Sequence, residues 1–194
     1  MFMCGAVSLA CMDQASWARE LAERLLAGPL PRRWAHSQGV GRKAESIADV
    51  FGKDASVLVA AAWLHDIGYA PELAASGFHP LDGARYLRDV VRADPVVCSL
   101  VAYHSYADIE ARHRGLADEL AEEFAPVSGA LSDALTYCDM TTTPDGTPTD
   151  VETRLAEIRS RYGAGHLVAE SMSEAGPQIV EAAEKVAELI DARR

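Results

Sequence analysis

A histidine and an aspartate stand side by side at the end of a long apolar run. Residues 57–64 are all apolar, and His65-Asp66 follows them directly. The run predicts a helix buried on most sides, and Gly68 indicates where that helix ends. An ionised aspartate at this position is desolvated and faces the negative end of the helix dipole, so it needs a positive partner.

No lysine or arginine between Lys53 and Arg85 can supply that positive partner from the same stretch of chain. A metal ion with His65 as a second ligand is therefore the economical interpretation of the dipeptide. The alternative is a partly exposed helix end with a hydrogen-bonded pair of His65 and Asp66. The dipeptide alone does not decide between the two.

Further ligand-type side chains continue apolar helical stripes elsewhere in the chain. They are His36 with Val40, Ile47 and Phe51, His79 with Gly83, Tyr86, Leu87 and Val90, His104 with Val96, Val97, Leu100 and Val101, and Asp139 with Leu131, Leu135 and Cys138. Spacings of three and four residues place side chains on one helix face, so each group should point inward. One inward histidine is usually a satisfied core residue. Several helices that each aim such a group inward favour a shared cation.

The order His36, His65-Asp66 and Asp139 resembles the H…HD…D pattern of the HD-domain metal-dependent phosphohydrolases. His79 and His104 match the two extra histidines of the subset that holds two metals. The resemblance covers residues 32–145 and implies an all-α fold with a dinuclear centre in its core. By this resemblance the first four residues hold one metal, and Asp66 bridges to a second metal that His79 and His104 complete.

One position departs from the family pattern. Many HD phosphohydrolases carry a lysine directly after HDxG, where it can assist phosphate binding, and here that position is Tyr69. The metal ligands survive this change. A phosphate-binding role at that position does not carry over.

The chemistry that two bound metals would supply is hydrolytic. Two adjacent ions can bind a shared water, lower its pKa and act as Lewis acids on a phosphoryl oxygen. Metal-bound hydroxide is the expected nucleophile, because no serine or cysteine stands in a nucleophile motif such as G-x-S-x-G. Mixed imidazole and carboxylate ligands suit Fe, Mn, Co, Ni or Zn better than Mg alone. The expected substrate is a small anionic phosphomonoester or phosphodiester, with nucleotides among the candidates.

Two other functions stay open at this stage. The same six ligands resemble those of HD-type di-iron oxygenases, which cleave a carbon bond with dioxygen. A non-catalytic metal-binding or regulatory module is also compatible with the missing lysine after HDIG. One scaffold can host several reactions, so the fold alone does not choose among them.

Five more residues are candidates for contact with substrate or with the metal ligands. Arg32 and Arg33 lie one turn before the first histidine, although a solvated basic pair is the more ordinary interpretation. Asp82 would either orient a ligand histidine or cap its helix. Ser105 directly follows a ligand, and Thr142 belongs to a threonine-rich loop expected near the mouth of the site.

Composition limits the class of protein. The chain has 194 residues, of which 49% are hydrophobic and 24% charged, as is typical of a globular protein. Its net charge of −11 argues against an electrostatic grip on DNA or RNA, because phosphate contacts need clustered lysine and arginine. The four cysteines form neither a metal-type pattern nor a disulfide framework, so a cytoplasmic location is expected. No segment has the length and apolar character of a membrane span.

Helical periodicity accounts for most of the chain, and no strand is predicted. The expected helices cover residues 13–27, 32–51, 54–67, 79–91, 94–107, 116–124, 127–141, 148–162 and 166–192. Residues 1–12 are apolar without the basic start of a signal peptide, so we expect a flexible extension or a segment upstream of a true start at Met12. Residues 13–194 should form one domain, with helices 148–192 packed on the motif-bearing core. The last helix is expected to pack on the bundle or to form a homodimer contact.

Overall fold

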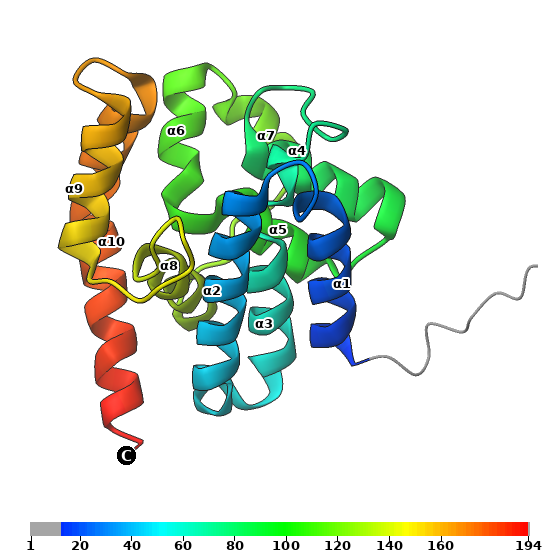
Figure 1. Cartoon of the computed structure of the whole chain (residues 1–194), viewed down its shortest axis with the longest axis vertical. Helices are drawn as coiled ribbons and strands as arrows, with labels where there is room; N and C mark the ends of the chain where they lie inside the picture. Colours follow the sequence, from blue (N-terminus) through cyan, green and yellow to red (C-terminus); the bar gives the residue numbers. More distant parts are fainter. Residues whose placement is uncertain (1–12, 194) are drawn as a thin grey trace, which may run out of the picture.

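The computed structural model describes residues 13–193, and they form a bundle of helices (Figure 1). The helices are α1 (Gln14–Leu26), α2 (Pro31–Ile47), α3 (Ala55–Leu64), α4 (His79–Tyr86), α5 (Pro95–Tyr103), α6 (Ala107–Arg114), α7 (Ala117–Glu123), α8 (Ala130–Met140), α9 (Val151–Tyr162) and α10 (Leu167–Asp191). No strand occurs within residues 13–193, so the expected all-α class is confirmed. The expected extension at residues 1–12 lies outside the described residues.

The apolar helix α3 lies in the interior of the bundle. Its residues 58–64 are all buried, and it packs against α1, α2, α5 and α8. A helix that is surrounded by other helices needs no polar face, which explains why its sequence is apolar all round. Because α3 ends at Leu64, the next two residues, His65 and Asp66, are delivered to the interior, where both are buried.

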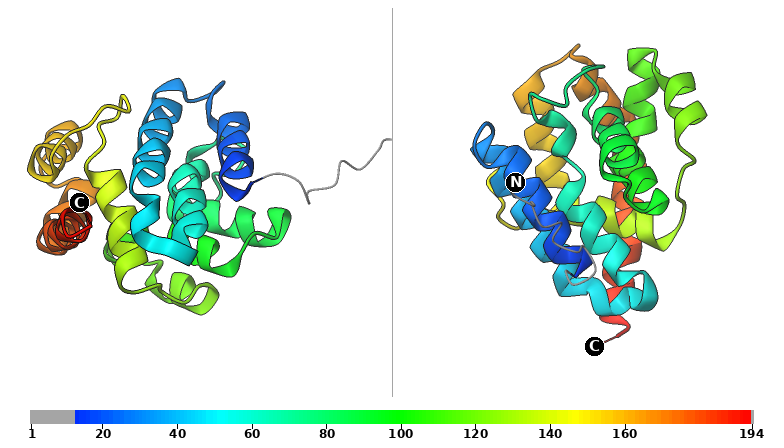
Figure 2. Two further views of the ribbon diagram at one scale, coloured as in Figure 1. Left: turned by 90° about the horizontal axis from the view of Figure 1, so that it is seen from below. Right: turned by 90° about the vertical axis from the view of Figure 1, so that its right-hand side faces the viewer.

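Helices α9 and α10 form a pair on the side of the bundle opposite α1 (Figures 1 and 2). The pair contacts the bundle mainly through α10, which packs on α8 and on α6. It contributes most of a second apolar cluster, made of Ile109, Met140, Val151, Leu155, Ile158, Met172, Ala175, Ile179 and Ala183. The last helix therefore packs on the bundle, and the alternative of a homodimer contact stays a prediction.

The segment around His104 differs from the helix expected at 94–107. Helix α5 ends at Tyr103, because Ser105 and Tyr106 have φ values of 50° and 60°, which no α-helix permits. Helix α6 then begins at Ala107 and runs to Arg114, and no helix was predicted for residues 108–114. It was missed because polar and charged residues dominate it, and its buried face includes the charged residue Glu110.

Two other expected helices are also shorter than predicted. The helix expected at 32–51 continues past Ile47 only as a short 3-10 segment, η2 (Ala48–Asp54). The helix expected at 79–91 continues past Tyr86 as one π-helical turn, η4 (Leu87–Val91). No helix within residues 13–193 is both long enough and apolar enough to cross a membrane.

The start of α4 lies against the segment that follows α3, and the approach depends on a glycine. A Cβ atom placed on Gly68 would lie 2.0 Å from the carbonyl oxygen of His79 and 2.6 Å from the amide nitrogen of Gly83. Both neighbours are backbone atoms, which cannot rotate away as a side chain does. Gly68 therefore sets how closely His79 can approach the end of α3.

We predict that Gly68→Ala destabilises the protein by about 2 kcal/mol or more, because the added methyl group would force two backbone segments apart. Gly28→Ala is the matched control, since a Cβ there meets no atom within 4 Å. Urea unfolding followed by circular dichroism would measure both variants. Equal midpoints for Gly68→Ala and the unchanged protein would show that the close approach is not needed.

Candidate metal centre

The structure brings together all six side chains that the sequence predicts as metal ligands. They come from five places: His36 in α2, His65 and Asp66 just after α3, His79 at the start of α4, His104 just after α5, and Asp139 in α8. Five of the six are buried and His79 is partly buried. The inward direction expected from the helical stripes is therefore what the structure shows.

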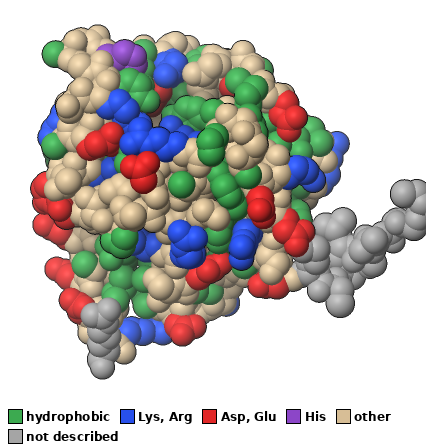
Figure 3. All heavy atoms as spheres, in the orientation of Figure 1, with side chains coloured by type: hydrophobic (Ala, Val, Ile, Leu, Met, Phe, Trp, Pro, Cys, Tyr) green, Lys and Arg blue, Asp and Glu red, His purple; other side chains and the backbone are tan. Residues whose placement is uncertain are grey.

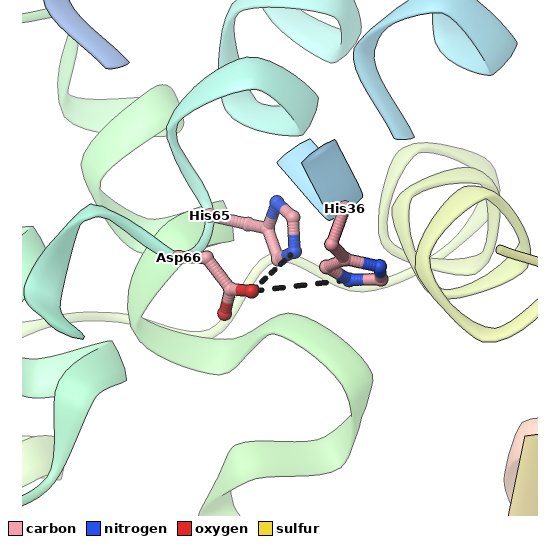
Figure 4. Close-up of side chains that lie close together, drawn as sticks. All are labelled: His36, His65 and Asp66. Atoms are coloured by element: carbon pink, nitrogen blue, oxygen red, sulfur yellow. Dashed lines mark ion pairs between the residues drawn. The ribbon is translucent and has the colours of Figure 1, made fainter. Parts of the chain in front are cut away.

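The two carboxylate oxygens of Asp66 face two different pairs of imidazoles. Oδ2 lies 3.3 Å from Nε2 of His65 and 3.8 Å from Nε2 of His36, as drawn in Figure 4. Oδ1 lies 3.3 Å from Nε2 of His79 and 4.0 Å from Nε2 of His104. Two groups of possible ligands therefore share Asp66, and each could hold one metal ion.

Asp139 adds a second carboxylate to the group around His36 and His65. Its Oδ1 lies 3.0 Å from Nε2 of His36 and 3.9 Å from Nε2 of His65. Its other oxygen, Oδ2, accepts a hydrogen bond of 2.5 Å from the hydroxyl of Ser105. Burial alone would raise the pKa of Asp139, but the hydrogen bond and charge of His36 and the charge of His65 outweigh it, so the pKa is lowered and the group stays ionised.

Backbone carbonyl groups fix three of the four imidazole rings. The Nδ1 atoms of His36, His65 and His104 lie 3.0, 2.8 and 2.7 Å from the carbonyl oxygens of Thr143, Ala62 and Val101. A carbonyl oxygen can only accept, so each Nδ1 carries a hydrogen atom. In a neutral ring the lone pair is then on Nε2, which points at the two carboxylates. This arrangement of a ring anchored on one nitrogen is typical of histidines that bind metals.

The ring nitrogens that converge on Asp66 fit a cation well. Nε2 of His65 is buried and has no hydrogen-bond partner within residues 13–193. The Nε2 atoms of His79 and His104 lie 3.2 Å apart. Burial, together with the neighbouring imidazoles, lowers the pKa of His104 to about 4, so this ring is neutral near pH 7. Imidazole nitrogens and carboxylate oxygens that meet in this way suit divalent transition metals.

A basic partner for Asp66 comes from α2, outside the stretch between Lys53 and Arg85 where the sequence offers none, so a metal ion is not its only positive partner. Nη1 of Arg33 donates to Oδ2 of Asp66 over 2.7 Å, and 23% of the Arg33 side chain is exposed. Burial would raise the pKa of Asp66, but Arg33 and His65 outweigh it and hold the pKa well below its usual value. Arg33 lies 33 residues before Asp66, at the start of α2, so no local sequence pattern indicates the pair.

The interpretation of Arg32 and Arg33 as a solvated pair is therefore right for one residue and wrong for the other. The exposed Arg32 pairs with Asp145 at 2.8 Å and, among residues 13–193, contacts no metal ligand through an ion pair. Arg33 instead lies with its guanidinium 4.0 Å above the ring of Tyr69. Tyr69 in turn stacks on the ring of His79, with centroids 3.9 Å apart. Tyr69, which stands where many family members have a lysine, thus holds Arg33 over the site.

Asp82 and Thr142 are placed differently from the expectations for them. The buried carboxylate of Asp82 accepts hydrogen bonds from the amides of Ala75 and Ser76, so it fixes the loop before α4 and neither orients a histidine nor caps the helix. The buried hydroxyl of Thr142 donates to the carbonyl of Cys138 and does not line the cavity at the metal ligands. The loop of Thr142 does lie at the site, because the carbonyl of Thr143 contacts His36, but the hydroxyl of Thr142 is bonded to the backbone.

A cavity of about 80 Å³ opens onto the metal ligands. It is lined by four of them, Asp66, His79, His104 and Asp139, and by Ser105 as expected. The sequence interpretation missed its other polar lining residues from α6 and α9, namely Glu110, Arg154, Arg161 and Tyr162. One signal was present in the sequence: Arg154 lies in the apolar stripe of Val151, Leu155 and Ile158, and all four are buried.

Comparisons with known proteins agree with this geometry. The family model described as "HD domain" matches residues 33–158, which is more than half of the chain. The chain belongs to the HD domain family. HD domains bind divalent metals and are generally hydrolases, within the metal-dependent phosphohydrolase superfamily.

A relative, Ribonuclease Y of Rubrobacter xylanophilus, is 33% identical over 76 residues. The match covers 39% of this chain and 15% of the relative, so the chain corresponds to a small part of that protein. No solved structure matches the chain.

We predict that variants of the two ligand groups differ in the number of metal ions that they bind. Asp66→Ala should lose both metals because its oxygens serve both groups, whereas His104→Ala should keep the metal of the group around His36 and His65. Elemental analysis after purification without chelators would measure the stoichiometry. His113→Ala is the matched control, because this histidine pairs with Glu174 outside the cavity. Full metal content in Asp66→Ala would rule out the bridging role.

Ser105 provides a finer test of the same centre. Ser105→Gly removes the hydroxyl that holds Asp139 and tolerates the φ of 50° better than alanine would. We expect the affinity for the first metal to fall roughly 10- to 100-fold, as for other lost contacts to metal ligands. Competition with a chelator of known affinity would measure it. Unchanged affinity would show that Asp139 needs no such anchor.

Proposed function

We propose that this HD domain hydrolyses small phosphate esters with two divalent transition-metal ions. His36, His65, Asp66 and Asp139 would hold one ion, and Asp66, His79 and His104 the other. The observation that carries the proposal is the division of Asp66, whose two oxygens face two separate pairs of imidazoles. When bound, the ions would supply a water of lowered pKa and Lewis acidity toward a phosphoryl oxygen.

The side chains around the ligands support a reaction on an anionic group. Arg33 shares the cavity with Asp66 and is held by the ring of Tyr69, so its other guanidinium N–H groups can donate to phosphoryl oxygens. This arginine would take the part that a lysine after HDxG plays in many family members. Burial raises the pKa of Tyr69 above its ordinary value, so the phenol is neutral and does not repel a phosphate.

Cavity size and net charge favour a small substrate over a polymer. A cavity of about 80 Å³ is well below the roughly 300–1,000 Å³ of most ligand pockets, so it admits a phosphoryl group and a short attachment. The net charge of −11 disfavours a long nucleic-acid backbone, because many phosphates need many lysine and arginine contacts. The relative is named a ribonuclease, but the match covers 15% of it, and we do not extend RNA cleavage to this chain.

We predict phosphate release from n-butyl phosphate by protein reloaded with Mn²⁺ or Co²⁺, and loss of release after chelation. His104→Ala should lower the rate at least about 100-fold, because one of two ions that act on the same phosphoryl group is lost. His113→Ala should keep the full rate. A malachite green assay would measure free phosphate, and a short RNA would be tested in parallel.

Three results would contradict the proposal. Oxygen uptake with a mixed-valence iron pair, without phosphate release, would identify an oxygenase. Faster cleavage of RNA than of any small ester would identify a nuclease. A fully metal-loaded protein without turnover on any of these substrates would identify a binding module.

A further inference from the structure

We propose that α9 carries an anion-binding subsite, made by Arg154 and Arg161, that holds a carboxylate at the far end of the substrate. The subsite rests on the same cavity as the proposed function and narrows the substrate to a phosphate ester with a carboxylate on a short apolar chain. Both arginines line the cavity that reaches Asp66 and His79. Neither belongs to the metal-ligand pattern.

Arg154 is the unusual residue of this cavity. Its side chain is 6% exposed, and its Nε is buried without a hydrogen-bond partner in the described part of the chain. Its Nη1 pairs with Glu157. A buried guanidinium with an unused donor is costly unless a ligand compensates it, because desolvation is not repaid. An apolar residue at this position of the α9 stripe would pack without that cost.

Arg161 adds a second positive charge next to Arg154. Its Nη2 donates to Oε2 of Glu157 over 3.0 Å, and Arg154 pairs with the same oxygen. Two guanidinium groups thus share one carboxylate, which leaves one positive charge unbalanced. The other buried acid of this wall, Glu110, is already paired with Arg114. A singly charged group such as a carboxylate restores the balance and can accept two hydrogen bonds from an arginine.

Part of the cavity wall is apolar. Met140, Ile158 and Met172 line the cavity together with the metal ligands and the arginines. These side chains offer no hydrogen bonds to a sugar or a base, and they suit a short methylene chain. Arg33 and Arg161 also line a second cavity of about 300 Å³, so the two cavities are neighbours. Figure 3 shows lysine and arginine side chains gathered on the part of this face between α9 and α2.

The test compares two ligands that do not turn over and differ at one end. The metal-loaded protein is titrated with 5-phosphonopentanoate and with n-pentylphosphonate, and calorimetry measures both affinities. We expect the carboxylate to raise affinity roughly 10- to 100-fold, as for hydrogen bonds between charged groups. Arg154→Met should reduce this ratio to about one, and Arg161→Met should reduce it in part.

Arg159→Met is the matched control, because this arginine lies on the same helix, is exposed and does not line the cavity. It should keep the full ratio. Arg154→Lys keeps the charge without the Nε donor and should retain only part of the ratio. Circular dichroism would confirm that each variant is folded, and Arg161→Met gives an answer should Arg154→Met not fold.

These measurements test the carboxylate subsite and the proposed hydrolysis separately. Equal affinity for the two phosphonates in the unchanged protein would overturn the subsite, whatever the rate on n-butyl phosphate. A ratio that depends on Arg154, without phosphate release, would keep the subsite and overturn the hydrolase. Absence of binding by both phosphonates would overturn the subsite too, since the arginines alone should hold the carboxylate.

Discussion

The structure depends on the burial of one ionised carboxylate, Asp66, where a helix ends inside the protein. Such a group is tolerated only if positive charge and hydrogen-bond donors surround it. Helices α2, α4 and α5 therefore each direct an imidazole or a guanidinium toward it. Gly68 lets α4 approach closely enough to take part. The site and the packing of the bundle are consequences of the same constraint.

Helical periodicity predicted the fold class, and together with the resemblance to the HD pattern it singled out the six ligand-type residues. Four of these residues, His36, His79, His104 and Asp139, continue an apolar stripe, so for them the pattern that marks the core also marks the direction of the ligand. Helix α6 escaped prediction because its buried face is short and partly charged. The break at Ser105 was equally hidden, because a positive φ at a serine has no sequence signal of its own.

Contacts between residues that lie far apart in the sequence were the part of the site that could not be predicted. The pairing of Arg33 with Asp66, and its stacking on Tyr69, depend on how α2 crosses the end of α3. Arg154 carried a usable signal, since a charged residue in an apolar stripe needs a reason to be there. For Asp82 and Thr142 the sequence suggested contacts at the site, but their side chains form hydrogen bonds with backbone groups instead.

Two of the rings are anchored in the same way, by the carbonyl three residues earlier in the chain: Ala62 for His65 and Val101 for His104. A main-chain oxygen cannot be deleted by a point mutation, so these orientations are shielded from sequence drift in the rest of the bundle. Each short segment therefore contains the backbone group that aligns its own ring. Grafting such a helix end onto an unrelated scaffold would transfer a correctly turned ligand with no supporting neighbours.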